Sequence, residues 1–380
     1  FVLSGAFADE VGARRFLDWL RTSSKLQTQQ GEIKLKLFEA ENLDEAFRIG
    51  DVHHDRFQIA ATHSDRTVST FGARLLLKLY PKLEEGPSLE QEALKHLAAV
   101  KFDRILRILA ALEYRQNAEA STILIAERLV SNQGNAWDYT LDELGRYYER
   151  ALIARKEILA ASEDASMFSL ISEKPSHHLS DVIGDYLQTA AQLGRRTAEL
   201  HLALAQESDD PNFRAQTMKT SDYDELVKQL KSHSEEAFEE LKTAYKKLSR
   251  GARERAQIIL RSRKDLISQF EDLRKWKLPL QKIRVHGCYD LGKLLWIKND
   301  FLIMDFEGEW GKTLEERRKL HSPLKDVAFM LRSFRYAAYT ALNRFTETRR
   351  QAYNQLEAWA NCWHRWVSAE FMREYRIIIA

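Results

Sequence analysis

The chain has 380 residues, of which 44% are hydrophobic and 30% are charged, the composition of an ordinary globular protein with room for two or three packed lobes. Its 58 basic and 56 acidic side chains leave a formal charge of +2, so bulk charge gives no sign of a nucleic-acid partner. No apolar run approaches the roughly 18 residues of a membrane span, so no membrane partner is expected. The two cysteines, Cys288 and Cys362, form no disulfide framework, which favours a cytoplasmic location.

The first third of the chain predicts mostly strands. Residues 1–60 contain a short amphipathic helix and then an alternating segment whose apolar residues share one face: Ile33, Leu35 and Leu37. Residues 57–80 predict two strands that turn near Gly72. Pro87 and Ser88 suit the start of a helix, and residues 102–130 return to strands. This order predicts a small mixed lobe.

From about residue 139 the apolar period becomes helical. Residues 222–275 predict a long helical hairpin with Gly251 as a candidate break. Strands return only at 283–306, and helices close the chain from about residue 323. We therefore predict an α+β, bilobal, protein-kinase-like fold with three parts: a cap-like subdomain (1–60), a β-rich nucleotide lobe (61–135), and a helical lobe (136–380) that carries a loop hairpin at 283–309.

A few polar residues fall where phosphoryl transfer would need them. Lys78 lies inside the apolar strand "LLLKLY", and Glu92 in the next helix is placed to pair with it. The alternative is that Lys78 merely extends to solvent from an edge strand. Asp305 ends the strand "FLIMDF", with Glu307 beside it, and such oxygen ligands suit Mg²⁺. A His-Gly pair about twenty residues upstream strengthens the interpretation as a phosphotransfer site.

Five segments in this order resemble maltokinase: "SNQGNAWDYTLDELGRY", "LGRRTAELHLALA", "HGCYDLGKLL", "DFEGE" and "LEERRKLHSPLKDVAFMLRSFRYAA". The resemblance covers nearly the whole chain. It implies the aminoglycoside phosphotransferase fold and transfer of phosphate from ATP, with Mg²⁺, to maltose or a related sugar, in a trehalose-to-glycogen pathway. The opening "ARRFLDWLRTSSKLQTQQGEI" resembles the start of the maltokinase part of trehalose synthase–maltokinase fusions, so a fused or associated trehalose synthase is the expected partner.

The resemblance assigns roles residue by residue. It places the strand lysine on Lys78 and its partner on Glu92. The adenine hinge falls on the segment that begins at Glu127 and ends at Val130, and the metal-binding acids are Asp305 and Glu307. The sugar side is carried by three residues: His286, Asp326 and Arg332.

Three positions of the catalytic loop depart from the family pattern. The family reads H-G-D-Y-H-L-G-Q and this chain reads H-G-C-Y-D-L-G-K. Cys288 replaces the general base, Asp290 replaces a histidine, and Lys293 replaces a metal-binding glutamine. Two like charges about 4 Å apart repel by roughly 4 kcal/mol at an effective dielectric of 20, so the ammonium of Lys293 opposes a metal ion there. We expect Lys293 to form an ion pair with Asp305 and phosphotransfer to be weakened or lost, leaving a role in assembly or regulation with trehalose synthase.

Other interpretations remain open at this stage. Asp290 is a candidate substitute base, which would make the chain an active sugar kinase. Cys288 beside His286 is a weaker candidate nucleophile. Two pairs of adjacent histidines suggest a metal site: His53 with His54, and His177 with His178. Their spacing matches no recognised set of metal ligands, which argues against such a site. Trp359, Trp363 and Trp366 fit a core or partner-helix face better than a sugar platform.

Overall fold

The computed structural model describes residues 10–22, 25–38, 56–62, 66–72, 74–116, 120–162, 165–275, 279–309 and 311–380. The chain forms two compact units. Unit 1 combines Phe1–Arg214 with Arg284–Ala380, and unit 2 is Ala215–Ile283. Unit 2 therefore lies within the part predicted as one helical lobe.

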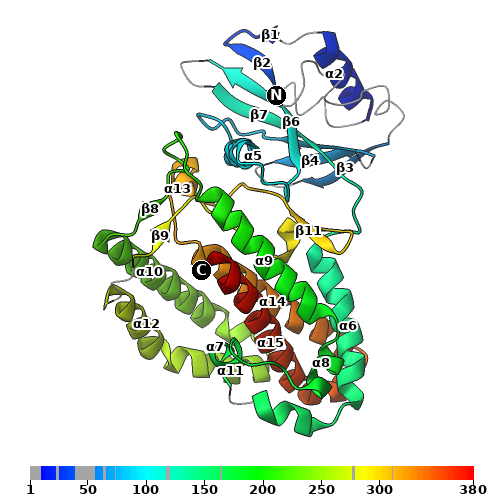
Figure 1. Cartoon of the computed structure of the whole chain (residues 1–380), viewed down its shortest axis with the longest axis vertical. Helices are drawn as coiled ribbons and strands as arrows, with labels where there is room; N and C mark the ends of the chain where they lie inside the picture. The colour runs from blue at the N-terminus through cyan, green and yellow to red at the C-terminus, as the bar shows by residue number, and fades with distance from the viewer. Residues whose placement is uncertain are drawn as a thin grey trace. The chain divides into compact units, whose positions relative to one another are not determined.

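Seven strands of unit 1 form one antiparallel sheet in the order β1-β2-β6-β7-β5-β4-β3 (Figure 1). The strands are β1 (Lys25–Gln27), β2 (Glu32–Leu37), β3 (Phe57–Thr62), β4 (Thr67–Phe71), β5 (Leu75–Leu79), β6 (Arg107–Arg115) and β7 (Ala120–Arg128). Because β1 and β2 pair into this sheet through β6, the sheet crosses the boundary predicted at residue 60. Residues 57–80 form three strands, and the prediction of two is wrong, because the chain reverses direction twice there.

Local sequence explains much of this lobe. The apolar side of β2 (Ile33, Leu35 and Leu37) packs on a buried cluster of the sheet, as the alternation predicted. Gly72 turns the chain between β4 and β5 with a φ of 53°, a left-handed conformation that glycine adopts without strain. Helix α2 (Glu10–Thr22) precedes the sheet. Helix α5 (Leu89–Ala99) begins after Ser88, whose side chain accepts a hydrogen bond from the Gln91 N–H group.

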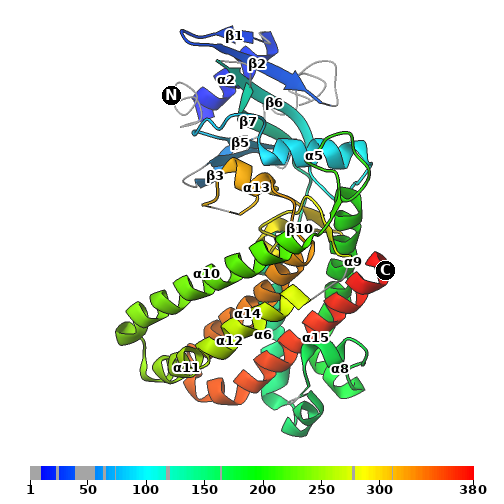
Figure 2. The same ribbon diagram turned by 90° about the vertical axis from the view of Figure 1, so that its left-hand side faces the viewer.

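The helical part of unit 1 includes a short hairpin of β10 (Leu294–Ile297) and β11 (Asp300–Ile303), which contacts α6 and α9. Its helices are α6 (Ala136–Ile153), α7 (Met167–Leu170), α8 (His177–Ile183), α9 (Tyr186–Leu204), α13 (Leu314–Arg318), α14 (Leu324–Thr346) and α15 (Tyr353–Ile379). Helices α9, α14 and α15 run side by side (Figures 1 and 2). The tryptophans of α15 are confirmed as core residues, because Trp359 and Trp363 are 0% exposed and Trp366 is 3% exposed.

Unit 2 is a helical hairpin built on a two-residue ribbon. Strands β8 (Gln216–Thr217) and β9 (Gln281–Lys282) pair antiparallel at its two ends. Helix α10 (Thr220–Ala244) packs along α12 (Arg263–Glu271), and α11 (Arg250–Arg261) lies between them in the chain (Figure 2). The helix break falls at residues 245–249 and not at Gly251, which lies inside the first turn of α11.

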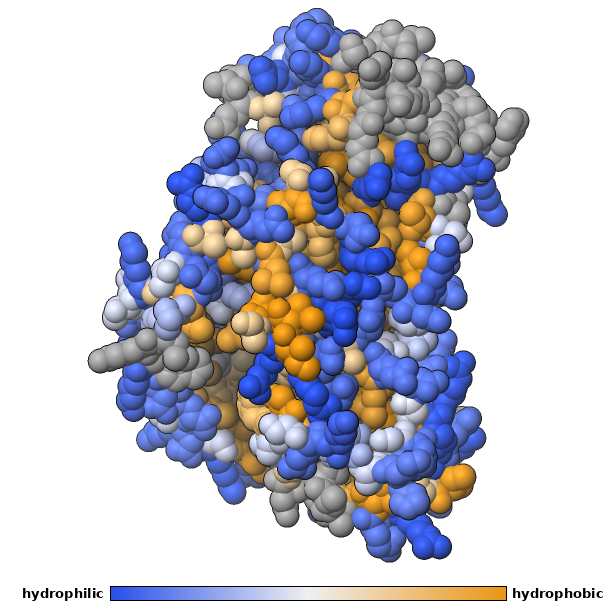
Figure 3. Space-filling view, in the orientation of Figure 1, coloured by the Kyte–Doolittle hydropathy of each residue, from blue (hydrophilic) through white to orange (hydrophobic). Residues whose placement is uncertain are grey.

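The face of the molecule drawn in Figure 3 is largely hydrophilic, with apolar residues showing mainly near the middle of the view. Among the described residues, none of the helices has the length and apolar character needed to cross a bilayer.

Candidate functional site

Lys78 of β5 is the centre of a buried cluster of charges. Only 1% of its side chain is exposed. Its ammonium lies 2.5 Å from a carboxylate oxygen of Glu90, 2.7 Å from Asp305 and 3.3 Å from Glu127. Lys78 therefore does not extend to solvent, and the alternative of an edge-strand lysine is wrong.

The partner of Lys78 on α5 is Glu90, so the predicted pair with Glu92 is wrong. Glu92 lies two residues on, about 200° around the helix, and meets different cations. Its carboxylate is 3.0 Å from the guanidinium of Arg284 and 2.9 Å from that of Arg318. Arg284 is 3% exposed and also lies over the ring of Phe213. Glu92 thus joins α5 to segments far along the chain and does not contribute to the Lys78 cluster.

The second half of the cluster follows β11. Asp305 has a φ of 64°, a left-handed conformation that aspartate tolerates better than bulky residues do. Its backbone N–H group donates to Glu90 at 3.1 Å. The expected ion pair with Lys293 is present, with the ammonium 3.0 Å from a carboxylate oxygen of Asp305. Whether this pair has the proposed inhibitory role stays a prediction.

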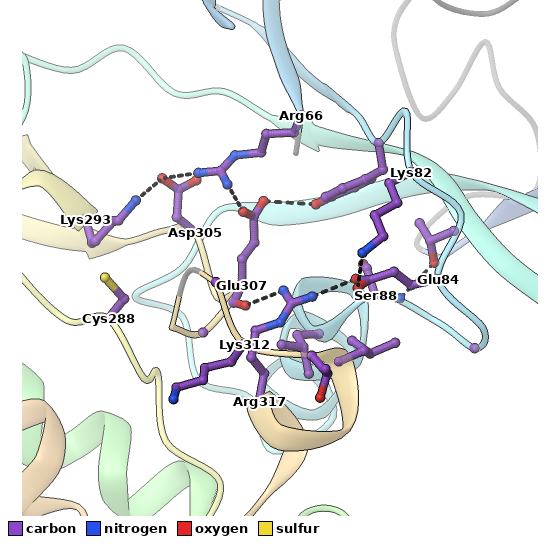
Figure 4. Close-up of a pocket in the computed structure, with 18 residues that line it drawn as sticks. Arg66, Lys82, Glu84, Ser88, Cys288, Lys293, Asp305, Glu307, Lys312 and Arg317 are labelled. Carbon is purple, nitrogen blue, oxygen red and sulfur yellow. Dashed lines mark hydrogen bonds and ion pairs between the residues drawn. The ribbon is translucent and has the colours of Figure 1, made fainter. Parts of the chain in front are cut away.

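A third cation, Arg66, enters the same cluster from the residue before β4. Its guanidinium is 3.8 Å from Asp305 and lies in close contact with a carboxyl oxygen of Glu307 (Figure 4). The hydroxyl of Tyr80 is 3.1 Å from carboxyl oxygens of both Glu90 and Glu307. Three cations (Arg66, Lys78, Lys293) therefore contact the acids of the site.

Burial and charge set the protonation of these acids. Burial acts to raise the pKa of Asp305, but Lys78 and Lys293 outweigh it and hold the pKa well below the usual value. Burial and the nearby charge of Glu90 raise the pKa of Glu307 to about 8. Burial also raises the pKa of Glu127, with a further contribution from Glu90. The site therefore sets a firmly ionised Asp305 beside Glu307, which retains its proton at neutral pH.

A metal ion does not fit this arrangement of side chains. Ligand oxygens of Glu90, Asp305 and Glu307 lie within 4.8 Å of one another, which is suitable spacing for a divalent cation. Each of these acids is already in contact with Lys78, Lys293 or Arg66. A magnesium ion would have to displace at least one ammonium or guanidinium group, because like charges at this range repel.

The loop that begins at His286 is anchored by Asp326 of α14. The Asp326 carboxylate accepts hydrogen bonds of 2.8 Å from the backbone N–H groups of His286 and Gly287 and lies 3.3 Å from the ring of His201. Gly287 has a φ of 86°, and a Cβ there would lie 3.1 Å from the Cα of Gly308. The start of the loop is thus held by Asp326, which lies outside the positions that differ from the maltokinase pattern.

His286 and Asp326 were predicted to lie against a sugar, and this is wrong as far as direct contact is concerned, because both side chains are buried. They are 1% and 0% exposed, and the Nε2 atom of His286 lies 2.9 Å from the carbonyl oxygen of Met304. Both residues position the loop. Arg332 is exposed, its guanidinium lies 5.0 Å from the ring centre of Phe329, and its sugar role stays a prediction.

Cys288 and Asp290 occupy the loop where the resemblance implies base chemistry. Burial raises the pKa of the Cys288 thiol, and the carboxylate of Asp290 raises it further, so the thiol stays protonated at neutral pH. One carboxylate oxygen of Asp290 accepts a 2.8 Å hydrogen bond from the N–H group of Gly292. That contact caps the short 3₁₀ turn Leu291–Lys293. The described contacts give Asp290 a structural role and leave its chemistry untested.

A pocket of about 760 Å³ opens beside the charged cluster. Its lining includes Cys288, Lys293, Asp305 and Glu307 (Figure 4). Neither Glu127 nor Val130 is in that lining. Glu127 is 1% exposed, and the carbonyl oxygen of Val130 accepts a hydrogen bond from the Asn132 side chain.

Apolar side chains fill the space next to the predicted hinge. A buried cluster of Leu76, Leu106 and Leu295 has further residues packed against it: Val68, Leu129, Val130, Ile297, Leu302 and Met304. The hinge role of residues 127–130 stays a prediction.

The histidine motifs fall outside this site. His177 and His178 lie with Asp181 at an exposed surface, and their ligand atoms are within 4.8 Å of one another. His177 lies 2.9 Å from Asp181, which an exposed ion pair explains. His53, His54 and His63 lie outside the described residues.

Sequence reasoning missed Glu90, Arg66 and Arg284. Glu90 and Glu92 lie in the same first turn of α5, so the choice between them depends only on which side of the helix meets β5. Arg66 lies in "HSDRT", where the maltokinase pattern reads Q-S-N-T-S, and that departure was the available signal.

The fold matches solved structures of glucosamine kinase. One, solved with glucosamine, ADP and inorganic phosphate, has a TM-score of 0.60 at 16% sequence identity and covers 94% of this chain and 82% of that chain. A second crystal form has a TM-score of 0.59 at 16% identity and covers 94% of this chain and 80% of that chain. No family model matches the chain. At this identity the likeness shows the fold alone, and it confirms the prediction of an α+β, bilobal, kinase-like fold.

Proposed function

We propose that this chain is a maltokinase-like protein whose phosphotransfer is lost and whose role is to assemble with, or regulate, a trehalose synthase. The contact between Lys293 and Asp305 carries the first part, because it puts an ammonium against the acid that would hold magnesium. Arg66 supports it from the opposite lobe by pairing with Glu307. Maltose or a related sugar, ATP and Mg²⁺ follow from the resemblance and are proposed on that ground.

General-base catalysis is the second function that the proposal expects to be lost. A positioned base contributes about 10²–10⁴-fold to rate, and a protonated thiol at Cys288 does not supply it. One carboxylate oxygen of Asp290 is also occupied by the loop backbone, which leaves a single oxygen of that group for a sugar hydroxyl. Loss of the base alone would therefore lower turnover by about 10²–10⁴-fold.

The test is a coupled assay for ADP release with Mg²⁺, ATP and a panel of mono- and disaccharides that includes maltose. We expect no sugar-dependent turnover above that of an Asp305→Asn variant, whose metal-binding acid has been removed. Calorimetry of ATP binding with and without Mg²⁺ should show no dependence on the metal.

The alternative, an active kinase with Asp290 as base, predicts the opposite result. Formation of maltose 1-phosphate that disappears in Asp290→Asn and persists in Lys319→Gln, a substitution at an exposed lysine outside the cluster, would overturn the proposal. Activity that survives Asp290→Asn but is lost in Cys288→Ala would also overturn the proposal. It would show in addition that Asp290 is not the base. Direct binding of purified trehalose synthase tests the partner separately.

A further inference from the structure

Positive charge is concentrated in one short stretch of unit 2. Residues 246–264 contain eight basic side chains and one acidic side chain, a formal charge of +7. Because the whole chain carries +2, the remainder carries −5. Helix α10 in the same unit is acidic, with seven acidic and three basic side chains. Positive charge is therefore concentrated in α11 and in the residues that join it to α10 and α12.

Helix α11 presents this charge on one side. Residues 250, 253, 254, 257, 258 and 261 recur at the helical spacing of three and four, and all of them are exposed. They include three arginines (Arg250, Arg253, Arg261) and one isoleucine, Ile258. The opposite side packs inward through Ala256, which is 3% exposed. We call this exposed stripe the α11 face, and Ile259 lies about 100° further around the helix than Ile258.

Helix α11 also exposes branched apolar side chains, on the α11 face and beside it. Ile258 is 65% exposed and Ile259 is 47% exposed. Two neighbouring isoleucines that solvate poorly, set among arginines, are characteristic of a surface that another molecule covers.

Much of the positive charge here is not balanced within the hairpin. Arg263 pairs with Glu235 and Glu239 of α10, and Arg250 lies 3.4 Å from Glu254. Within the part of the chain that the structure describes, Arg261 has no carboxylate partner, and neither do three lysines: Lys246, Lys247 and Lys264. These cations remain available to an external group.

We infer that the α11 face docks an acidic amphipathic helix of a partner protein. Charge complementarity requires an anionic occupant. Five of the eight cations are arginines, whose planar donor groups pair with carboxylates in a bidentate manner and are enriched at protein interfaces. A helix that lies in a lipid surface normally brings aromatic or leucine anchors, and the exposed apolar residues of α11 are isoleucines alone. The isoleucines would meet apolar residues of the partner helix, and its carboxylates would meet the arginines. This inference does not depend on whether phosphotransfer is lost.

The test measures binding of a labelled, helical Glu/Leu peptide to the full chain by fluorescence anisotropy. We expect binding that weakens as salt is raised, because exposed charges are screened beyond about 10 Å at 0.1 M. The triple variant Arg250→Glu, Arg253→Glu, Arg261→Glu should weaken binding by at least about tenfold, because like charges then face the peptide. Ile258→Ser should weaken it by about threefold to tenfold through lost apolar burial.

A matched triple variant tests whether the loss of peptide binding is specific to the α11 face. Lys34→Glu, Lys101→Glu and Lys319→Glu make the same charge change at exposed positions of unit 1 and should leave binding unchanged. Circular dichroism checks that both triple variants fold. Equal weakening in the two triple variants would overturn the inference, as would no effect of Ile258→Ser. Binding of heparin or phosphatidylserine vesicles without binding of the peptide would also overturn it, as would self-association of the chain that the α11 substitutions abolish.

Discussion

Asp305 is in contact with two ammonium groups and faces one guanidinium group at 3.8 Å. An acid that binds magnesium needs at least one carboxylate oxygen directed at the ion. In this cluster, Lys78 and Lys293 each contact a different oxygen of the same carboxylate. The positive charge that would normally come with the metal is already provided by side chains.

Glu307 gives this cluster a measurable dependence on pH. Its pKa is raised to about 8 by burial and by Glu90, so the folded protein holds a proton that the unfolded protein releases above about pH 4.5. Stability should therefore fall as pH rises from about 5 to 8 and then level off. In Glu307→Gln this fall should be smaller by at least about 1 kcal/mol, since each pKa unit corresponds to roughly 1.4 kcal/mol.

Urea unfolding of both proteins between pH 5 and 9 measures this effect. Glu127 has a raised pKa as well and is unchanged in the variant, so part of the slope should remain. Parallel curves for the two proteins would show that Glu307 is ionised throughout, and the explanation would then be wrong.

At the residue scale, the sequence predicted contacts along one strand or loop better than contacts across a helix. The Lys293–Asp305 pair was predictable because both residues border the β10–β11 hairpin. The choice between Glu90 and Glu92 was not, because the side of α5 that meets β5 depends on tertiary packing. Arg66 was not predicted for the same reason, since it reaches Glu307 across 241 positions of sequence.

Among the elements, α5 connects the sheet to the rest of unit 1 through two sets of ion pairs. Glu90 contacts Lys78 on one side of the helix, and Glu92 contacts Arg284 and Arg318 on the other. His96 near its end lies 3.2 Å from the carbonyl oxygen of Ala203 in α9. The orientation of this helix is therefore fixed at three points.

Glu92→Gln should remove about 3–5 kcal/mol of stability, because it leaves the buried guanidinium of Arg284 without its counter-charge. Urea unfolding followed by circular dichroism measures the loss. The matched control is Asp272→Asn, which breaks an exposed pair with Lys275 and should cost less than about 1 kcal/mol. A loss in Glu92→Gln no larger than in the control would mean that the pair contributes little.

Element types were predictable where one period dominated. The alternation in β2 and the helical spacing in α15 were correct because each element buries one regular face. The strand count in residues 57–80 failed because β3, β4 and β5 are only 6, 5 and 5 residues long. Periodicity over so few residues does not separate one strand from the next.

On the scale of the whole molecule, the two ends of unit 2 leave and rejoin the chain side by side. Gln216 pairs with Lys282 and Thr217 with Gln281, and the Met218 N–H group donates to Leu280. An insertion with adjacent ends can be removed with little strain on the segments that flank it. The sequence did not reveal this boundary, because the helical periodicity continues through residues 222–275.

Replacement of residues 215–283 by a short Gly-Ser linker should leave unit 1 folded. The expected result is a cooperative thermal transition and hydrogen-exchange protection of β10 and β11 that match those of the full chain. A control that deletes α15 should fail to fold, because it removes Trp359, Trp363 and their neighbours from the core. Loss of protection at β10 and β11 in the linker variant would show that unit 1 needs the insertion.

The hydrogen bonds from His286 and Gly287 to Asp326 have a consequence for how this protein changes over generations. They hold the start of the loop through its backbone N–H groups, so exchange of the side chain at 288 should have little effect on that path, whereas Asp290 caps the turn that follows. Selection for a folded chain therefore exerts little restraint on the chemistry at residue 288. A designer who placed an acid at 288 and an amide at 293 would find the main chain at the start of the loop already held.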